Sequence, residues 1–503
     1  MFAPRGRGTE FCQTMAAKPA QQPVEGVAAL KQFHWDPQPA AWALVNELVN
    51  NFLAHCPGAA TVAAKMKHDT ATRFVDWVDH LIVPRTDALK ARLKEVGYVR
   101  KAMPGAPECY LNDKGIFPAI ILVGGKTTRV AIKVESVCDF LTAWHIADDP
   151  TISEDDIEGD PLCQIRKAVA FKADNAELWV IERHGALGFA APDLDPDKAV
   201  NTLKHFEIFR RRARDWDDDD IGYDHTEAIV AAAVKDLGPD LACDLFFAAE
   251  REFWQRKNKA AQIQKARQDK LGLGWANHDH HTYRSSRQYF KRLIGTFETL
   301  GFKCRERFYA GAEAGWGAQV LEQPVCGITI FADVDMSPEE ILGDFSHNGL
   351  DARKELGTVG LWCGLHGEAL LQAGMHHLEC VFDHEALKDQ LEAANIETMD
   401  PFTNFSFLKQ AFTVGERWKI SEKRLLKLLE SGVITASQAS VFRAEGAIGS
   451  HLENLERNDG YKGFNQHGVS DIIARTDPRK LASVAAPAAA PSTGTQLPEV
   501  VGA

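Results

Sequence analysis

The alternation of apolar and polar positions repeats three times along the chain, in the same order of strand and helix. The second repeat is the clearest, because an alternating run at 280–284 precedes a helical pattern at 288–300. Its later strands are predicted at 301–308, 317–323 and 327–333. Three weak copies of one unit explain this order better than coincidence.

The first and third copies are less regular. The first has a strand at 75–83, a helix at 87–96 and two strands around the turn Gly124-Gly125. The third begins at Met375 and has a helix at 385–394. The pattern therefore predicts an α+β fold built from paired βαβββ modules, with a degenerate N-terminal copy.

Helical spacing dominates between the first and second copies, notably at 226–237 and 240–270. A further helical insert at 421–430 and 436–444 interrupts the third copy. The predicted organisation is a disordered tail at 1–26, N-terminal helices with the degenerate module at 27–140, a mainly helical insertion at 141–270, a catalytic paired-module metal domain at 271–480 and a disordered tail at 481–503.

Composition narrows the classes of protein that fit this pattern. The chain has 503 residues and a net charge of -13, which does not supply the basic face that a nucleic-acid binder needs. No apolar run reaches the roughly 20 residues of a membrane span, so we expect a soluble protein without a membrane partner. The ten cysteines include no Cys-x-x-Cys pair, which favours reduced thiols in the cytoplasm. An organelle transit segment at 1–26 is the alternative.

Candidate metal ligands lie on the predicted strands. The segment Asp279-His280-His281-Thr282-Tyr283-Arg284 places an imidazole and a guanidinium four residues apart, on one face of a regular strand. His377 opens the equivalent strand of the next copy, and Glu453 adds a carboxylate. Two imidazoles and one carboxylate on separate strands can hold a divalent ion and leave positions open. Arg284 offers a bidentate fork for an anionic substrate.

The sequence leaves alternatives for the carboxylate ligand and for the neighbouring histidines. Glu322 and Glu445 compete with Glu453. His281 and His376 adjoin the ligand candidates, but in a regular strand they point to the opposite face, which favours structural or supporting roles.

Two further signals predict no metal. His80 holds the ligand position of the first copy, but Pro84 stands where Arg284 stands in the second, so the first copy is expected to be a structural module. The acidic run at 215–220 lacks the glycine and the final glutamate of a calcium loop and is expected to be a solvated turn.

Three motifs resemble those of a known family. Asp-His-His-Thr-Tyr-Arg at 279–284 is similar to Asp-His-x-Ala-Phe-Arg, and His376-His377-Leu378 is similar to Asn-His-x-Thr. Ser-His-Leu-Glu-Asn-Leu-Glu-Arg at 450–457 is similar to Ser-Tyr-x-Glu-Phe-Ala-Glu-Arg. In this order they resemble the 2-oxoadipate dioxygenase/decarboxylase (hydroxyglutarate synthase) family of the vicinal-oxygen-chelate superfamily. The resemblance covers about 275 to 478 and fits poorly at 395–450.

The resemblance implies a sheet cupped around a non-haem Fe(II) site, with Mn(II) or Zn(II) less suited. It implies His280, His377 and Glu453 as ligands and Arg284 as the residue that grips a substrate carboxylate. The implied reaction is oxidative decarboxylation of a small 2-oxo acid by molecular oxygen, giving a shortened 2-hydroxy acid and CO2. The alternatives are a metal-dependent isomerase or lyase of the same superfamily, and a small-molecule binding protein without catalysis.

Overall fold

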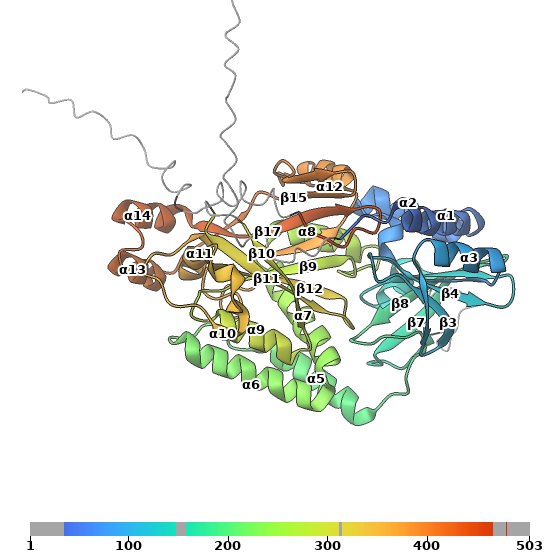
Figure 1. Cartoon of the computed structure of the whole chain (residues 1–503), viewed down its shortest axis with the longest axis horizontal. Helices are drawn as coiled ribbons and strands as arrows, with labels where there is room; N and C mark the ends of the chain where they lie inside the picture. The colour runs from blue at the N-terminus through green and yellow to red at the C-terminus, as the bar shows by residue number, and fades with distance from the viewer. Residues whose placement is uncertain (1–34, 147–156, 311–313, 466–478, 480–503) are drawn as a thin grey trace, which may run out of the picture.

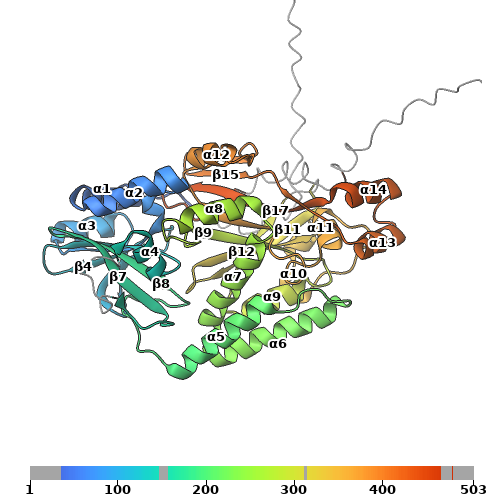
Figure 2. The same cartoon turned by 180° about the vertical axis from the view of Figure 1, so that it is seen from behind.

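The computed structural model describes residues 35–146, 157–310, 314–465 and 479, and Figures 1 and 2 show it from two sides. The tails predicted at 1–26 and 481–503 lie outside these residues, as does the transit segment considered for the N-terminus. Within the described part of the chain, no helix is both long enough and apolar enough to cross a bilayer.

The C-terminal half of the chain forms one mixed sheet from two βαβββ units. The first unit consists of β9 (His278–Arg284), α9 (Phe290–Thr299), β10 (Lys303–Tyr309), β11 (Trp316–Gln323) and β12 (Ile328–Asp335). The second consists of β13 (His377–Val381), α12 (His384–Glu392), β14 (Thr403–Phe405), β15 (Leu408–Phe412) and β17 (Ala447–Arg457). The strand order is β10-β11-β12-β9-β13-β17-β15-β14, and β16 (Glu416–Trp418) pairs with β17. Each unit fills one half of the sheet, so the predicted fold class is confirmed.

The N-terminal half repeats this arrangement in a second mixed sheet. Its first unit consists of β1 (Val78–Pro84), α3 (Asp87–Glu95), β2 (Val99–Met103), β3 (Ala106–Leu111) and β4 (Ala119–Val123). Its second unit consists of β5 (Thr128–Lys133), α4 (Val137–Ala143), β6 (Ile157–Glu158), β7 (Ile165–Ala173) and β8 (Ala176–Arg183). The order β2-β3-β4-β1-β5-β8-β7-β6 matches that of the C-terminal sheet position by position.

The structure corrects the prediction for residues 141–270, because β6, β7 and β8 lie within that interval. The N-terminal sheet therefore contains two modules, where the sequence predicted one. The positively charged Arg166, Lys167 and Lys172 occupy exposed or half-buried positions of β7 and obscure its apolar alternation. The turn to β8 passes through Asn175, whose φ of 59° lies in the left-handed region that asparagine tolerates.

Helices do fill the rest of that interval. They are α5 (Pro196–Arg211), α6 (Asp219–Leu237), α7 (Pro239–Gln255) and α8 (Lys259–Asp269), which follow α1 (Pro39–His55) and α2 (Pro57–Thr70) in the chain. In both views α5, α6 and α7 lie below the C-terminal sheet and connect it with the N-terminal sheet (Figures 1 and 2). Proline at the first turn of α5 and α7 fits a helix start, because the first N–H groups have no intrahelical partner.

Helix α7 covers one face of the central strand β9. The Phe247 ring lies 5.1 Å from the ring of His281 and 6.1 Å from that of Tyr283, and both are fully buried. Side chains alternate across a strand, so His280, Thr282 and Arg284 face the opposite side of the sheet. The packing of α7 thus determines which residues of β9 reach the candidate site.

The insert predicted within the third copy is helical, as expected. It comprises α13 (Glu422–Glu430) and α14 (Ala436–Glu445), which pack with α11 (Thr358–His366) around Leu361, Leu425 and Phe442. The short α10 (Phe345–Asn348) lies beside α9. Trp362, also on α11, lies near the end of β9, and its ring is 5.5 Å from the Arg284 guanidinium.

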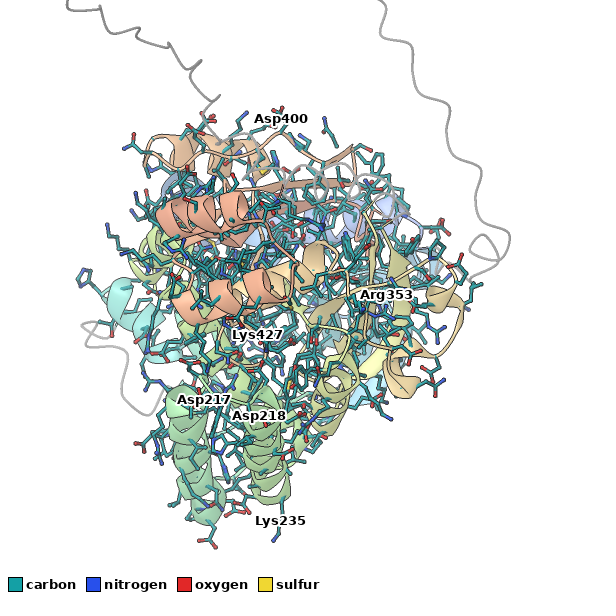
Figure 3. All side chains as sticks on the ribbon, turned by 90° about the vertical axis from the view of Figure 1, so that its left-hand side faces the viewer. Asp217, Asp218, Lys235, Arg353, Asp400 and Lys427 are labelled. Carbon is teal, nitrogen blue, oxygen red and sulfur yellow. The ribbon has the colours of Figure 1, made fainter. Side chains whose placement is uncertain are left out.

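Charged side chains lie on the outer surface of α5 and α6. Figure 3 shows Asp217 and Asp218 at one end of the α5 and α6 pair and Lys235 at the other. Asp218 accepts a hydrogen bond from the backbone N–H of Asp220 and so caps α6, while the exposed Asp217 pairs with Lys423 at 2.5 Å. The acidic run at 215–220 is mostly exposed, as predicted, but the prediction of a turn holds only for its first part, because Asp218 caps α6 and Asp219 and Asp220 begin this helix.

His184, just after β8, connects the N-terminal sheet with α7. Its Nδ1 lies 3.0 Å from the carboxylate of Asp244, and its Nε2 lies 3.8 Å from Glu182, which Arg166 also contacts. Burial opposes the charged imidazolium, but the two carboxylates outweigh it and raise the pKa of His184 to about 10. The raised pKa means that His184 stabilises the fold while protonated.

The stability contribution of His184 is full below its unfolded pKa of about 6.5 and is lost as the pH rises toward 10. We predict that His184→Gln lowers the free energy of unfolding by on the order of 2 kcal/mol at pH 6. The difference from the unsubstituted protein should shrink steadily up to pH 10. Urea unfolding at pH 6, 8 and 10 measures this, and a difference that does not change with pH would contradict it.

Candidate active site

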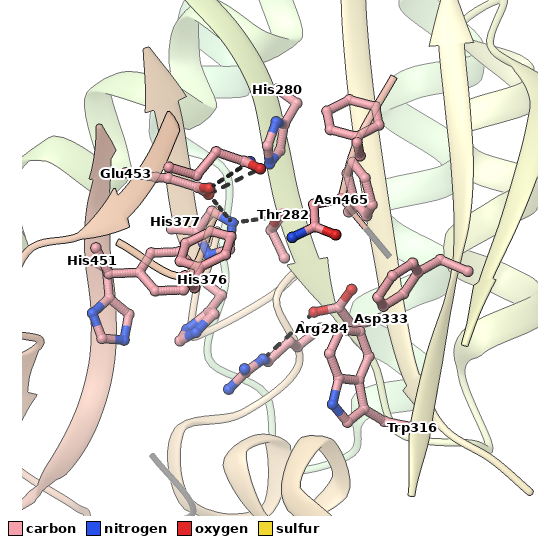
Figure 4. Close-up of a pocket in the computed structure, with 16 residues that line it drawn as sticks. His280, Thr282, Arg284, Trp316, Asp333, His376, His377, His451, Glu453 and Asn465 are labelled. Carbon is pink, nitrogen blue, oxygen red and sulfur yellow. Dashed lines mark hydrogen bonds and ion pairs between the residues drawn. The ribbon is translucent and has the colours of Figure 1, made fainter. Parts of the chain in front are cut away.

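The three predicted ligands converge on the face of the sheet opposite α7. His280 on β9 and His377 on β13 have ring centroids 5.8 Å apart, and both are buried. The Glu453 Oε2 on β17 lies 3.1 Å from Nε2 of His377 and 3.6 Å from Nε2 of His280. Figure 4 shows the Glu453 carboxylate between the two imidazoles. The convergence predicted from the sequence is present, and the role of the three as metal ligands stays a prediction.

These distances fit a divalent metal ion. Donor atoms about 2.1 Å from an ion lie about 3 Å apart when they occupy adjacent corners of an octahedron. One atom from each of the three side chains falls within 4.8 Å of the others. Burial and the nearby Glu379 raise the pKa of Glu453 well above its usual value, so a bound cation would favour the ionised form of this carboxyl. Imidazole and carboxylate together suit Fe(II), Mn(II) or Zn(II).

Glu379 supports this cluster from β13. Its fully buried carboxylate places Oε1 2.5 Å from Nδ1 of His280, on the ring edge away from Glu453. The amide of Gln410 donates to both Glu379 Oε2, at 2.9 Å, and Glu453 Oε1, at 3.1 Å. A carboxylate that fixes the distal nitrogen of a ligating histidine sets the orientation of the ring and increases its basicity.

Asp279 and Arg457 form a clamp behind His280. The guanidinium donates from Nε and Nη2 to the two carboxylate oxygens, at 3.0 and 3.1 Å. Asp279 also lies 3.6 Å from Nδ1 of His280. Burial opposes protonation of His280, but Glu379 and Asp279 outweigh burial and raise its pKa to about 9. The local field therefore favours a positive charge at this point.

Arg284 lies at the other end of the same cavity, and its ion pair with the protein is long. Its side chain is buried, and its nearest carboxylate is Asp333, 3.8 Å from Nε. The described residues accept no hydrogen bond from this guanidinium, and its Nε is buried without a partner. Burial, only partly offset by Arg284, raises the pKa of Asp333 to about 7. A buried guanidinium with its donors free is suited to bind a carboxylate ligand.

The cavity between these groups is small and largely aromatic. Its volume is about 60 Å³, enough for a few water molecules or part of a small ligand. Aromatic side chains make up much of its wall: Phe308, Trp316, Phe331, Phe402, Phe412 and Phe464. The site thus combines charged groups at each end with a largely aromatic wall between them (Figure 4).

His376 differs from its prediction, whereas His281 agrees with it. His281 faces α7, but His376 lines the cavity, because it precedes the first residue of β13 and does not follow strand alternation. His451 lines the cavity beside it. Their Nδ1 atoms lie 2.9 Å from the carbonyls of Gly449 and Thr413, respectively. Burial lowers the pKa of His451 to about 4 and that of His376 well below normal, so both are neutral.

The two alternative carboxylates do not line this cavity. Glu322 forms ion pairs with Lys462, at 3.0 Å, and with Arg305, at 3.4 Å. Glu445 is exposed on α14 and lies 3.6 Å from Arg417. Both have protein cations as partners, and we retain Glu453 as the candidate ligand.

The N-terminal sheet has a related frame but a different set of central residues. Arg183 donates to Asp79 at 2.7 and 2.8 Å, and Asp79 lies 2.6 Å from Nδ1 of His80, as in the C-terminal clamp. By strand register, however, Arg129 takes the place of His377 and Trp179 that of Glu453. These replacements remove two of the three donors and agree with a structural N-terminal copy.

Several residues of the site escaped the sequence prediction. Glu379 follows His377 by two positions, so strand alternation alone would have placed both on one face. Asp333, at the end of a predicted strand, and Gln410, in the poorly matching region, had no comparable motif, and His451 lies within the motif at 450–457 but was given no role by the resemblance. Their positions depend on strand register, which the sequence pattern did not specify.

Comparisons with known proteins give only distant likenesses. The sequence matches no family model and no curated protein. A candidate hydrolase from Shewanella frigidimarina NCIMB 400 has 13% identity and a TM-score of 0.31, over 44% of this chain and 98% of that one. A mutant 4-hydroxymandelate synthase from Streptomyces coelicolor has 10% identity and a TM-score of 0.23, over 81% and 98%.

A third solved structure is similarly remote. Methylmalonyl-CoA epimerase from Mycobacterium tuberculosis has 12% identity and a TM-score of 0.21, over 36% of this chain and 88% of that one. Likeness at these scores carries no argument about function. The assignment of the fold rests on the two matching strand orders.

We predict that the purified protein binds one equivalent of Fe(II) or Co(II), and that His280→Ala, His377→Ala and Glu453→Ala each abolish stoichiometric binding. Elemental analysis after dialysis measures the content. Glu322→Ala and Glu445→Ala serve as controls, because each removes a carboxylate outside the cavity. Metal loss in a control together with retention in Glu453→Ala would reverse the choice of carboxylate.

We predict a smaller effect for Glu379→Gln, which keeps the size of the side chain but removes its charge. Metal affinity should fall by about 10- to 100-fold, as is typical when the partner of a ligating histidine is lost. Competition against a chelator of known affinity measures the change. An unchanged affinity would show that Glu379 does not orient His280.

Proposed function

We propose that this protein is a non-haem Fe(II)-dependent dioxygenase and decarboxylase of a small 2-oxo dicarboxylic acid such as 2-oxoadipate. One O2 would be consumed per substrate, giving one CO2 and one shortened 2-hydroxy acid. The observation that supports this most directly is the buried Arg284 guanidinium, free of hydrogen bonds within the described residues, in one cavity with His280, His377 and Glu453. We further propose that residues 271–480 form the catalytic domain.

The spacing along β9 supports a substrate that is acidic at both ends. Arg284 follows His280 by four positions, so their Cα atoms lie about 13 Å apart along an extended strand. The distance between the ends of their side chains would be shorter. Arg284 would bind and orient the far carboxylate through its paired N–H donors. The 2-oxo acid end would lie near His280, His377 and Glu453. Iron held by these three residues would supply oxygen activation and Lewis acidity.

The other residues of the cavity would position these groups and limit access of water. Glu379 and Gln410 hold His280 and Glu453 in place from behind. Phe331 and Phe464 pack edge-to-face at 4.6 Å on one wall, and the Phe464 ring lies 5.3 Å from that of His280. An apolar wall strengthens electrostatic contacts with a bound anion, because it lowers the local dielectric.

The activity is tested with Fe(II)-loaded protein, an oxygen electrode and a series of 2-oxo dicarboxylates of increasing length. We predict oxygen uptake with equal amounts of CO2 and 2-hydroxy acid, and no turnover under nitrogen. The corresponding 2-oxo monocarboxylates serve as matched substrates that lack the group for Arg284. Turnover of every 2-oxo acid at one rate would contradict the proposed recognition.

Arg284→Ala should keep the metal and raise KM for the dicarboxylate by about 10- to 150-fold, since a charge-assisted contact contributes about 1.5–3 kcal/mol. Arg284→Lys should recover only part of this, because an ammonium cannot form the paired contact. Exposed Arg353 provides the control variant Arg353→Ala. Loss of metal with normal KM in Arg284→Ala would contradict the assigned role.

Asp333 favours a second candidate function, a metal-dependent isomerase. A carboxyl with a pKa of about 7 in the cavity is suited to remove a proton next to a carbonyl group. Such an enzyme would exchange substrate hydrogen with solvent deuterium and consume no oxygen. Deuterium incorporation under nitrogen, lost in Asp333→Asn, would therefore support this alternative over the dioxygenase.

A further inference from the structure

A second, larger cavity lies between the N-terminal sheet and the helices that follow it. Its volume is about 430 Å³. The ends of β5 and β8, helices α5 and α7, and the residues just before β9 contribute to its wall. His278 at the start of β9 reaches this cavity, whereas His280 reaches the candidate active site. The two cavities therefore share β9 but have different linings.

Most charged side chains of the second cavity have an ion-pair partner, either on its wall or next to it. The ion pairs are Arg166 with Glu182 at 2.9 Å, Arg183 with Asp79 at 2.7 Å, His184 with Asp244 at 3.0 Å and Lys265 with Glu135 at 3.1 Å. Each acidic group that lines the cavity thus already has a cationic partner. Two cations, Lys133 and Arg251, are left over.

These two cations lack a charged partner within the described residues. Arg251 is 8% exposed, its Nε is buried without a hydrogen bond, and its one polar side-chain contact is a 3.4 Å approach to Nε2 of His281. Lys133 forms no hydrogen bond or ion pair through its amine with the described residues; the carboxylates of Asp244 and Asp79 favour its charge from a distance, and the guanidiniums of Arg251 and Arg183 oppose it. Burial lowers the pKa of Lys133. The carboxylates of this cavity are already paired with other cations, so Arg251 and Lys133 leave an excess of positive charge on its wall, which is costly to bury.

Apart from Ser136, Thr202 and His278, the rest of the lining is apolar. Leu241, Leu245 and Ala248 on α7, Phe206 on α5 and Trp275 before β9 face the cavity. Leu203 and Leu162, also on its wall, are 56% and 39% exposed and place apolar groups on the surface side of the cavity. A ligand that fits both the free cations and this lining has an anionic head and an apolar body.

We propose that the second cavity is a binding site for an organic carboxylate with an apolar chain, whose carboxylate lies between Lys133 and Arg251. The chain packs against Leu241, Leu245 and Trp275. This ligand differs from the dicarboxylate proposed for the active site, which carries an acid group at each end. The second site depends on neither the metal nor Arg284.

Hexanoate is a suitable probe, and hexanol and inorganic phosphate are its matched comparisons. Titration calorimetry should show one hexanoate per chain, and both comparison compounds should bind at least 10-fold more weakly. Hexanoate should also raise the thermal unfolding temperature, because it binds the folded state. Quenching or enhancement of Trp275 fluorescence, lost in Trp275→Phe, places the ligand in this cavity.

Substitutions separate this site from the active site. Arg251→Met and Lys133→Met should each weaken hexanoate binding at least 10-fold, with metal content unchanged. Lys259→Met removes an exposed positive charge from α8 and should leave binding unchanged. Arg284→Ala should also bind hexanoate normally. Without ligand, Arg251→Met should unfold at the same or a higher temperature, because the substitution removes an uncompensated buried charge.

Three results would overturn the proposal. The first is the absence of hexanoate binding to the unsubstituted protein. The second is equal hexanoate binding by the double variant Arg251→Met and Lys133→Met. The third is loss of binding in Arg284→Ala, which would move hexanoate to the active site. Stronger binding of phosphate than of hexanoate would likewise refute the apolar part of the assignment.

Discussion

The register of three central strands governs the candidate active site. β9 and β13 run antiparallel with Thr282 opposite His377, and β17 runs parallel to β13 with Glu453 opposite Glu379. Because side chains alternate across a strand, a slip of one residue in either ladder would turn ligand candidates toward the opposite face. The aromatic contacts of α7 with His281 and Tyr283 fix this choice of face.

Three carboxylates with little exposure to solvent lie next to the proposed metal site. Glu453 and Glu379 are buried and Asp279 is nearly so, and Arg457 pairs closely with Asp279, at 3.0 Å, but only distantly with Glu379, at 3.9 Å. Such an arrangement is unfavourable for an empty protein interior and favourable around a divalent ion. The opposite polarity occurs at Arg284, where a cation lacks its anion. The end of the cavity near Glu453 is therefore suited to a cation, and the end near Arg284 is suited to an anion.

The sequence predicted the repeated unit and the three converging residues, because each has a local signature. Strand alternation marks β9 and its neighbours, and the short motifs mark His280, His377 and Glu453. The second module of the N-terminal sheet was missed, since charged residues on β7 hide its alternation. Cavity residues such as Asp333 and Gln410 were missed for another reason. Their roles arise from pairing between strands distant in sequence, which a local pattern does not encode.

The same Asp–Arg clamp occurs in both sheets, as Asp79 with Arg183 and as Asp279 with Arg457. Asp79 and Arg183 occur in a sheet whose central positions are held by Arg129 and Trp179, so the clamp persists where no metal chemistry is expected. The clamp is therefore a structural feature common to both sheets. The side chains at the central positions differ between the sheets without changing the clamp. The N-terminal sheet therefore keeps the same frame without two of the three donor side chains, and its strand ends instead form one wall of the second cavity.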